Sequence, residues 1–303
     1  MEQNVQVYNR EKDQIEVENI YASGFLDWLY YTKSGKILGQ LLCCSPVGAL
    51  YGQIKSSKKS ASEIPEFIKK YSIQENEFLD SKDESGNQRY FSFNDYFKRK
   101  FKEGQRPFCT EKNRLAAFAE ARYLVSNEFN PDDSIPVKGS NINLEVLLNN
   151  KDWADKFAEG PLAIARLAPV DYHRFHFPDD GQLAKQWDVD GKLHSVGKKA
   201  LLSKPEILQI NQRVVSILET ENFGTLAYIE VGAFCVGHIV QKSKKEEMFK
   251  RGDEKGYFLF GGSTVIILGQ KGTFQFDADL VEQSQKGIET LVKLGQPIAT
   301  RIK

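Results

Sequence analysis

The sequence predicts an α+β fold in which an N-terminal helical segment precedes a larger, mostly antiparallel β-sheet domain. Between Tyr21 and about Lys70, apolar residues recur at the three- and four-residue spacing of amphipathic helices. Beyond Pro107, short apolar stretches alternate with Gly, Pro and Asn/Asp turns, which is typical of antiparallel strands. No internal repeat of about 20–50 residues is visible, which argues against solenoids and propellers. We therefore expect an N-terminal segment over residues 1–105 and a β domain over 106–303.

The composition narrows the class of protein. The 303 residues include 41 Lys or Arg and 41 Asp or Glu, so the formal net charge is zero. A protein that mainly neutralises nucleic-acid phosphates would be basic, so we expect no nucleic-acid partner. No apolar run is long enough to span a bilayer, and the N-terminus lacks the layout of a secretory signal. The four cysteines show no CxxC spacing, and free thiols in a reducing compartment account for them most simply.

The first helical stretch combines an apolar stripe with basic residues. Its apolar positions are Phe25, Leu26, Leu29, Ile37, Leu38, Leu41 and Leu42, and the interleaved lysines are Lys33, Lys36, Lys55, Lys58 and Lys59. Such helices can lie in a membrane interface, with the apolar face down and the lysines toward anionic headgroups. The alternative is an ordinary helix packed on its own domain.

Further elements follow from local signals. Residues 1–20 are strand-like at best, and Ser92 with Asp95 forms a capping-box pattern that predicts a short amphipathic helix. In the β domain, the expected short helices lie over Leu144–Leu148 and Glu206–Val215. Lys250, Arg251 and Lys255 are expected on a solvated loop, since glutamates lie nearby.

Two of the four histidines, His173 and His176, stand three residues apart between Pro169 and Pro178. A turn between prolines suits side chains that are held in place and aimed into a site, where imidazole can transfer protons near neutral pH. A metal site would need further ligands, and no HExxH motif accompanies the pair. Two structural histidines are the alternative.

A second cluster is Gly261-Gly262-Ser263-Thr264, set between two apolar strand-like stretches. Paired glycines give the backbone freedom, and a serine directly after them is a candidate nucleophile if a base reaches it. The motif is neither a GxSxG elbow nor a P-loop, because a Val-rich strand follows and no Gly-Lys-Ser/Thr is present. A glycine kink in a strand is the structural alternative.

Together these segments resemble the phosphatidylserine decarboxylase family. LAPVDYHRFHFP, AYIEVGAFCVGHI, KGYFLFGGSTVIIL and FDADL occur in that family's order, and SFNDYFKRKFKEGQRP resembles its upstream signature. The resemblance implies self-cleavage at Gly262–Ser263 into a β chain, 1–262, and an α chain, 263–303. Ser263 would become a covalent pyruvoyl group, the cofactor of these enzymes.

The resemblance also implies a reaction and its residues. The pyruvoyl group would form a Schiff base with phosphatidylserine and release CO2, giving phosphatidylethanolamine. His173 is then the expected donor that reprotonates the α-carbon, and His176 the base of the cleavage step. Family membership further implies a homodimer that is peripheral to an anionic membrane surface on the cytoplasmic side.

Besides Ser263 and His176, the family uses a carboxylate for self-cleavage, and at this position the sequence departs from the family pattern. The family has an aspartate in a Pro-x-Asp-Gly motif, and counting back from Lys138 places Glu120 at this position. The carboxylate persists one methylene longer, so it can still hold an imidazolium, but Phe118 and Ala121 replace the proline and the glycine. Asp132 and Asp133 are alternatives that align less well.

This departure keeps two other functions open. One is a pyruvoyl-dependent decarboxylase of a free amino acid, because a remodelled pocket can change the substrate. The other is an uncleaved, non-catalytic relative that binds lipid.

Overall fold

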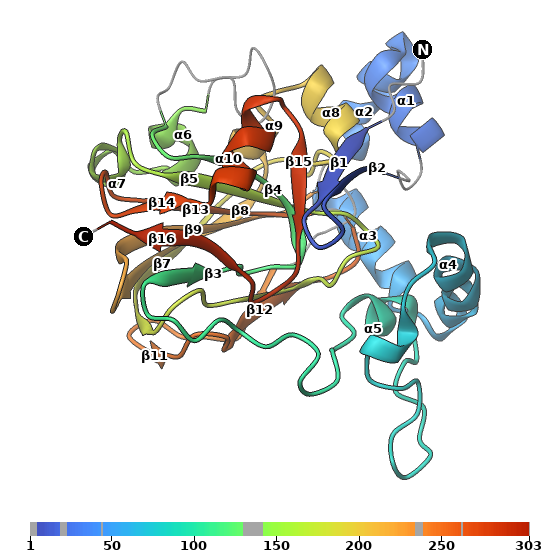
Figure 1. Cartoon of the computed structure of the whole chain (residues 1–303). Helices are drawn as coiled ribbons and strands as arrows, with labels where there is room; N and C mark the ends of the chain where they lie inside the picture. The colour runs from blue at the N-terminus through green and yellow to red at the C-terminus, as the bar shows by residue number, and fades with distance from the viewer. Residues whose placement is uncertain are drawn as a thin grey trace.

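The computed structural model describes residues 5–18, 23–43, 45–129, 142–233, 239–261 and 263–302 (Figure 1). Helices and strands are mixed along the chain, and most strand pairs are antiparallel. The expected antiparallel sheet is therefore confirmed. Gly262, Asp132, Asp133 and Lys138 lie outside the described residues.

A ten-stranded sheet forms the centre of the described structure. Its strands, in spatial order, are β11 (Met248–Phe249), β7 (Gly181–Val189), β8 (Arg213–Thr220), β9 (Gly224–Val231), β13 (Ser263–Gly269), β5 (Leu162–Leu167), β4 (Ala121–Ser126), β15 (Glu289–Val292), β1 (Gln6–Asn9) and β2 (Gln14–Val17). Neighbours are antiparallel except β1 and β15, which pair in parallel. The N-terminal segment thus contributes two strands to the main sheet.

Two three-stranded sheets accompany the main sheet. One has the order β10 (Ile239–Gln241), β12 (Glu254–Phe258) and β6 (Arg174–His176); the other has β14 (Phe274–Phe276), β16 (Pro297–Arg301) and β3 (Arg114–Ala116). The first carries both the histidine segment, on β6, and the approach to the glycine pair, on β12. It therefore brings the two candidate clusters of the sequence to one region.

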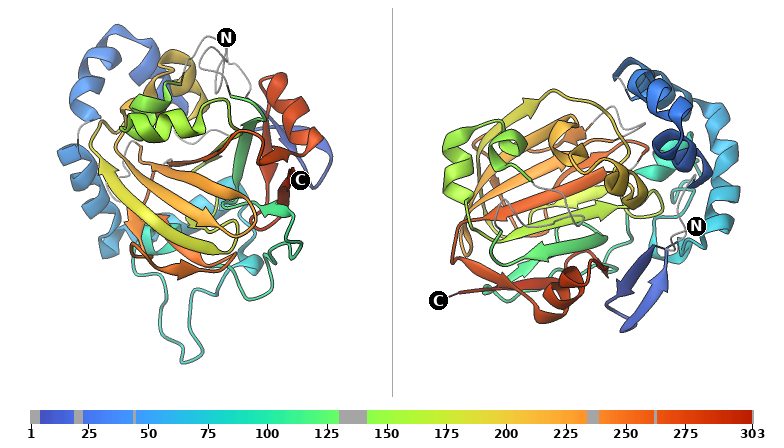
Figure 2. Two further views of the ribbon diagram at one scale, coloured as in Figure 1. Left: turned by 90° about the vertical axis from the view of Figure 1, so that its left-hand side faces the viewer. Right: turned by 90° about the horizontal axis from the view of Figure 1, so that it is seen from above.

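Most of the N-terminal helices gather at one side of the molecule, next to the β1–β2 hairpin (Figures 1 and 2). They are α1 (Ser23–Tyr31), α2 (Lys33–Leu42), α3 (Ser45–Lys55), the 3₁₀ turn η1 (Lys58–Glu63), α4 (Ile64–Tyr71), the 3₁₀ turn η2 (Glu75–Glu77) and α5 (Phe93–Phe97). The expected boundary near residue 105 stays a prediction.

Shorter helices interrupt the strands that follow. They are α6 (Leu144–Leu148), α7 (Lys151–Phe157), α8 (Lys198–Ser203), α9 (Ile207–Ile210) and α10 (Ala278–Gln285). The helix expected over 144–148 is confirmed, but the one expected over 206–215 is wrong in its second half. There β8 begins at Arg213 and pairs with both β7 and β9, because its β-branched residues favour a buried strand.

The predicted capping box is confirmed at the start of α5. The Ser92 hydroxyl oxygen accepts a hydrogen bond from the Asp95 backbone N–H (3.2 Å). In return, the Asp95 carboxylate accepts from the Phe91 N–H (3.1 Å) and from the Ser92 hydroxyl (2.9 Å). These bonds satisfy donors that a helix N-terminus leaves free.

Strand β13 lies inside the main sheet and is buried along its whole length. Val265 and Ile267 belong to the core cluster that includes residues of the two small sheets. Ile266 and Leu268, on the other face, pack into a cluster with residues of the helices. Because both faces are covered, the strand that begins at Ser263 is a fixed platform for the site.

Candidate active site

Ser263 is the first residue of β13 and is fully buried. Its register partner on β5 is Leu167, the residue just before the segment that leads to the histidines. Gly261 has φ of 143°, a conformation that side chains other than glycine rarely adopt. The backbone before Ser263 therefore requires at least this glycine, as the sequence indicated.

His173 is in direct contact with Ser263. Its ring Nδ1 lies 3.2 Å from the Ser263 Oγ, and its Nε2 lies 2.9 Å from the Ala168 carbonyl oxygen. Because a carbonyl can only accept, Nε2 carries the proton in this arrangement and Nδ1 is left to accept from the serine hydroxyl. A base thus reaches the serine that follows the glycine pair.

The surroundings of His173 keep its ring neutral. Phe97 stacks on the imidazole with the ring centroids 3.9 Å apart, and the side chain is completely buried. Burial, followed by the positive charge of Arg99, lowers the pKa of His173 to about 3. The ring is consequently a proton acceptor throughout the neutral pH range.

His176 occupies a different position. Its Nδ1 donates to the Gly252 carbonyl (2.8 Å), and its Nε2 lies 3.2 Å from the Tyr172 hydroxyl. Burial lowers the pKa of His176 below its usual value. Both ring nitrogens are thus engaged away from Ser263. Tyr172 was missed by the sequence analysis, although it directly precedes His173.

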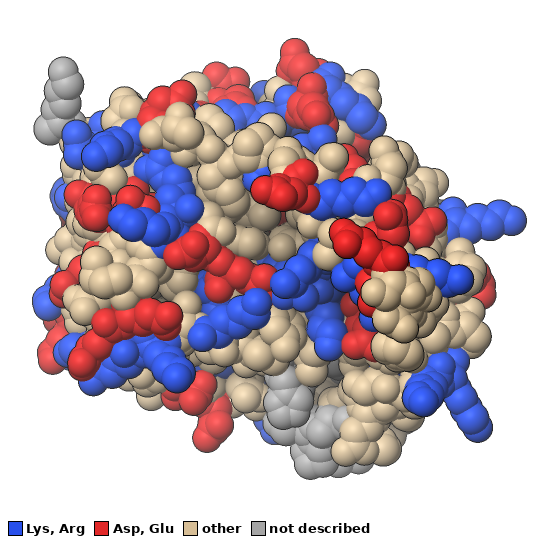
Figure 3. Space-filling view, turned by 90° about the horizontal axis from the view of Figure 1, so that it is seen from below, with Lys and Arg blue, Asp and Glu red and all other residues tan. Residues whose placement is uncertain are grey.

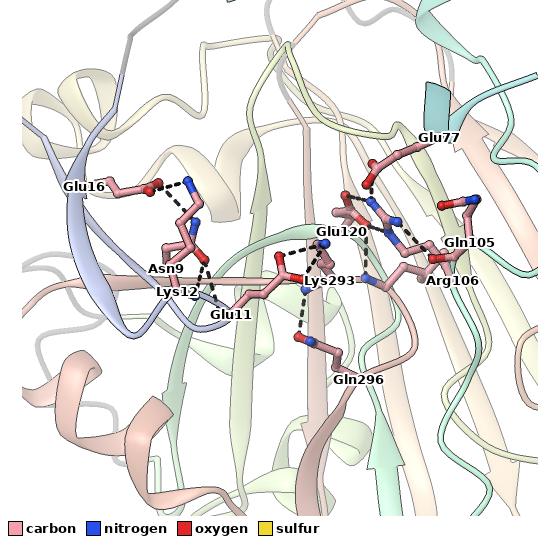
Figure 4. A network of polar contacts seen from close by, with 11 residues as sticks. Asn9, Glu11, Lys12, Glu16, Glu77, Gln105, Arg106, Glu120, Lys293 and Gln296 are labelled. Atoms are coloured by element: carbon pink, nitrogen blue, oxygen red, sulfur yellow. Dashed lines mark hydrogen bonds and ion pairs between the residues drawn. The ribbon is translucent and has the colours of Figure 1, made fainter. Parts of the chain in front are cut away.

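Glu120 is held by an arginine (Figure 4). Arg106 donates to both carboxylate oxygens, from Nε (2.5 Å) and from Nη2 (2.9 Å), and also binds Glu77. The Leu294 N–H adds a longer hydrogen bond to Glu120 (3.3 Å). The backbone N–H of His176 donates to the Phe118 carbonyl (2.8 Å), so the segment that carries Glu120 runs beside His176. The described hydrogen bonds of Glu120 go to Arg106 and Leu294 rather than to an imidazole.

Two charged positions complete the comparison with the sequence. The expectation that Lys255 lies on a solvated loop is wrong, because it is fully buried on β12 and pairs with buried Glu230 (2.6 Å). Asp277, in the FDADL segment, binds Arg10 (2.8 Å) and Arg114 (2.6 Å) at the start of α10, which is a structural role. Within the described part of the chain, no three His, Cys, Asp or Glu side chains are grouped as a metal ion would need.

Comparisons with known proteins identify the family of this chain. Residues 93–300 match the family model described as phosphatidylserine decarboxylase. Phosphatidylserine decarboxylase proenzymes of Clostridium novyi (strain NT) and Clostridium tetani (strain Massachusetts / E88) are 37% and 38% identical, each over 98% of this chain and over 100% and 98% of their own lengths. The proenzyme of Fusobacterium nucleatum is 36% identical over 96% of each chain. The chain therefore belongs to the phosphatidylserine decarboxylase family.

Proposed function

We propose that this chain is a phosphatidylserine decarboxylase that makes its own pyruvoyl group from Ser263 and converts phosphatidylserine to phosphatidylethanolamine and CO2. The contact between the Ser263 hydroxyl and the Nδ1 of His173 carries the proposal, because it unites the two clusters that the sequence singled out. Relatives of nearly equal length, all named proenzymes, support both the substrate and the cleavage.

Self-cleavage follows from ordinary acyl chemistry at Ser263. The Ser263 oxygen attacks the carbonyl carbon of Gly262, the peptide C–N bond breaks, and an ester with a free amine results. Loss of the Ser263 α-proton then breaks the bond between Cβ and Oγ of Ser263. The oxygen stays with residue 262 as part of a carboxylate, and residue 263 becomes a dehydroalanine. Water replaces the nitrogen of that residue, which departs as ammonia, and the pyruvoyl cap remains.

The position of Ser263 fits such a cap. Residue 263 is buried at the start of a rigid strand and faces a neutral imidazole, so a ketone there is shielded from water. When present, the pyruvoyl group supplies a ketone that captures the substrate amine and acts as the electron sink for loss of CO2.

His173 exchanges protons with this centre. Its Nδ1 can take a proton from residue 263 and can deliver one to the α-carbon of the substrate. Burial lowers the pKa of His173 to about 3, so a proton that the ring takes up is readily given away again. The same ring can therefore act first as a base and later as an acid.

His176 and Glu120 are proposed for the cleavage step, as the sequence analysis expected. What supports this is the backbone bond between His176 and Phe118, which keeps the two residues on adjacent segments. Their side chains are held by Tyr172 and Arg106, so forming a relay requires both to change partners.

The proposed membrane contact is the exposed apolar face of α2 and α3. Ile37 on α2 and Leu50 on α3 are 70% and 60% exposed, and Leu38 and Ile54 on the same two helices are also exposed. Lys33 and Lys36 are exposed on the same helix as Ile37. In contrast, basic and acidic side chains are interspersed on the face seen in Figure 3. We propose that the homodimer binds an anionic cytoplasmic membrane surface through this α2–α3 face.

Among the described residues, no helix has both the length and the apolar character needed to cross a bilayer.

Two measurements test the function and its alternatives. On a denaturing gel, the purified chain should give two bands and Ser263→Ala one intact band. A single full-length band from the unmutated chain would favour the uncleaved, lipid-binding relative. Cleaved protein should release CO2 from phosphatidylserine in detergent micelles. Turnover of free amino acids instead would favour the amino-acid decarboxylase.

A further inference from the structure

We infer that Asp171, held by Arg122, is a positioning residue that fixes the orientation and the tautomer of His173 through the turn Ala168–Asp171. The expected change in kcat rests on the proposed function. The structural part of the inference, the tautomer of His173, can be measured without any turnover.

The turn is closed by Asp171 in both directions. The Asp171 backbone N–H donates to the Ala168 carbonyl (2.9 Å), and the Asp171 carboxylate accepts from the Ala168 N–H (2.7 Å). The same Ala168 carbonyl accepts the Nε2–H of His173 (2.9 Å). A carbonyl oxygen has two lone pairs, so both of its acceptor positions are used.

Arg122 ties this turn to the main sheet. Its Nη1 donates to the Asp171 carboxylate, and each of the two side chains is 9% exposed. Arg122 on β4 is the register partner of Arg166 on β5, and Leu167, the next residue of β5, is the partner of Ser263 on β13. The carboxylate that closes the turn is therefore anchored to β4 and the serine that faces His173 to β13, the two strands that flank β5 in one sheet.

Buried acidic groups balance the two arginines. Glu18 and Glu289 both bind Arg166, at 2.8 and 2.6 Å, and Glu18 also pairs with Arg122. Buried charges that lack such partners are strongly destabilising. Arg122 is thus held in place independently of Asp171.

A second arginine holds the turn at another point. Arg99 donates from Nη2 to the carbonyls of Val170 (2.8 Å) and Asp171 (3.3 Å). Phe97, two residues earlier, stacks on the ring of His173. The imidazole is thereby fixed by one hydrogen bond at Nε2 and by one stacking contact, and the hydrogen bond depends on the turn.

The turn determines which ring nitrogen of His173 carries the proton. As long as the Ala168 carbonyl holds the Nε2–H, Nδ1 is unprotonated and faces residue 263. If the turn opens, the carbonyl can rotate away and the proton can move to Nδ1, where it blocks the exchange with residue 263. Asp171 contacts no reacting atom and acts only through this orientation.

The test compares Asp171→Ala and Asp171→Asn with Asp277→Ala. Asp277 is a matched control, because it is also bonded to arginines but lies outside the site. Three quantities are measured on the full chain: the melting temperature, the 15N NMR signature of the His173 tautomer in the Ser263→Ala background, and kcat and KM on phosphatidylserine micelles per cleaved chain.

In Asp171→Ala we expect Nδ1–H tautomer to appear and kcat to fall about 100-fold with KM unchanged. Asp171→Asn should recover part of kcat, because its amide oxygen can still accept from the Ala168 N–H. Asp277→Ala should lower the melting temperature but keep the tautomer and kcat.

Wild-type tautomer and kcat in a folded Asp171→Ala protein would overturn the inference. If that variant does not fold, Asp171→Asn decides by the same two readouts. If the wild-type chain makes no phosphatidylethanolamine, the proposed function has failed. The tautomer then decides the inference alone.

Discussion

Replacing His173 by glutamine removes the ring nitrogen that accepts the Ser263 hydroxyl. Glutamine has similar size and polarity and can keep a donor toward the Ala168 carbonyl, but it cannot take up a proton at neutral pH. The substitution therefore isolates proton exchange at residue 263 from packing against Phe97.

The magnitude follows from the geometry. The Nδ1–Oγ distance of 3.2 Å is within hydrogen-bond reach, and with a pKa of about 3 the ring is almost entirely in its acceptor form at pH 7. Loss of such a positioned proton acceptor lowers the rate of the step that it serves by about 10²–10⁴-fold. This corresponds to about 2.7–5.4 kcal/mol of transition-state stabilisation. Packing losses alone would leave a smaller effect on the rate.

The assay separates the two reactions. Cleavage is followed on a denaturing gel after pulse labelling, and decarboxylation is measured as CO2 released per cleaved chain. His176→Gln is the matched control, because it makes the same substitution at a ring whose nitrogens bond Tyr172 and Gly252 rather than Ser263. Loss of these two bonds costs about 1 kcal/mol each in stability. This variant should affect cleavage but keep decarboxylation per cleaved chain within a few-fold of the wild type.

The reasoning is refuted if His173→Gln cleaves itself and decarboxylates phosphatidylserine at wild-type rates. It is equally refuted if His176→Gln, and not His173→Gln, abolishes decarboxylation per cleaved chain.

Three further predictions concern pH, the carboxylate and the membrane. Because burial lowers the pKa of both His173 and His176, both rings keep an acceptor form as the pH falls, so cleavage should show no loss near pH 6.5; a rate that halves there would mean that one of these rings has an ordinary pKa. Below that pH the unfolded chain binds the proton that the folded chain does not, so acid should lower the melting temperature. Glu120→Asp should keep cleavage and Glu120→Gln should slow it at least about 10-fold on the gel, since only the former retains a charge; equal rates would remove Glu120 from the cleavage step. Ile37→Glu with Ile54→Glu should reduce sedimentation with anionic liposomes, whereas Ile15→Glu, at another exposed apolar position, should not; equal loss in both would place the membrane contact elsewhere.

Local patterns in the sequence were sufficient for several elements. The capping box at Ser92 and the helix over 144–148 depend on residues within one or two turns of each other, and the structure confirms both. The serine after the glycine pair and the two histidines between prolines could also be singled out, because each cluster gathers unusual residue types in its own short stretch.

Contacts between distant segments could not be predicted in this way. Arg106 binds Glu120 across a loop, and Arg122 binds Asp171 from a neighbouring strand. No local pattern encodes the path of the chain that brings Arg106 to Glu120, or the pairing of β4 with β5 that brings Arg122 to Asp171. Lys255 looked exposed for the same reason, because its partner Glu230 belongs to another strand.

The central claim is that Ser263 becomes a pyruvoyl group through cleavage of the bond before it. The intact mass of the purified chain tests this most directly. We predict two species, residues 1–262 with a free carboxylate and residues 263–303 lighter by one ammonia than a chain that begins with serine. A single mass for all 303 residues, or a second chain that begins with an unmodified serine, would contradict the claim.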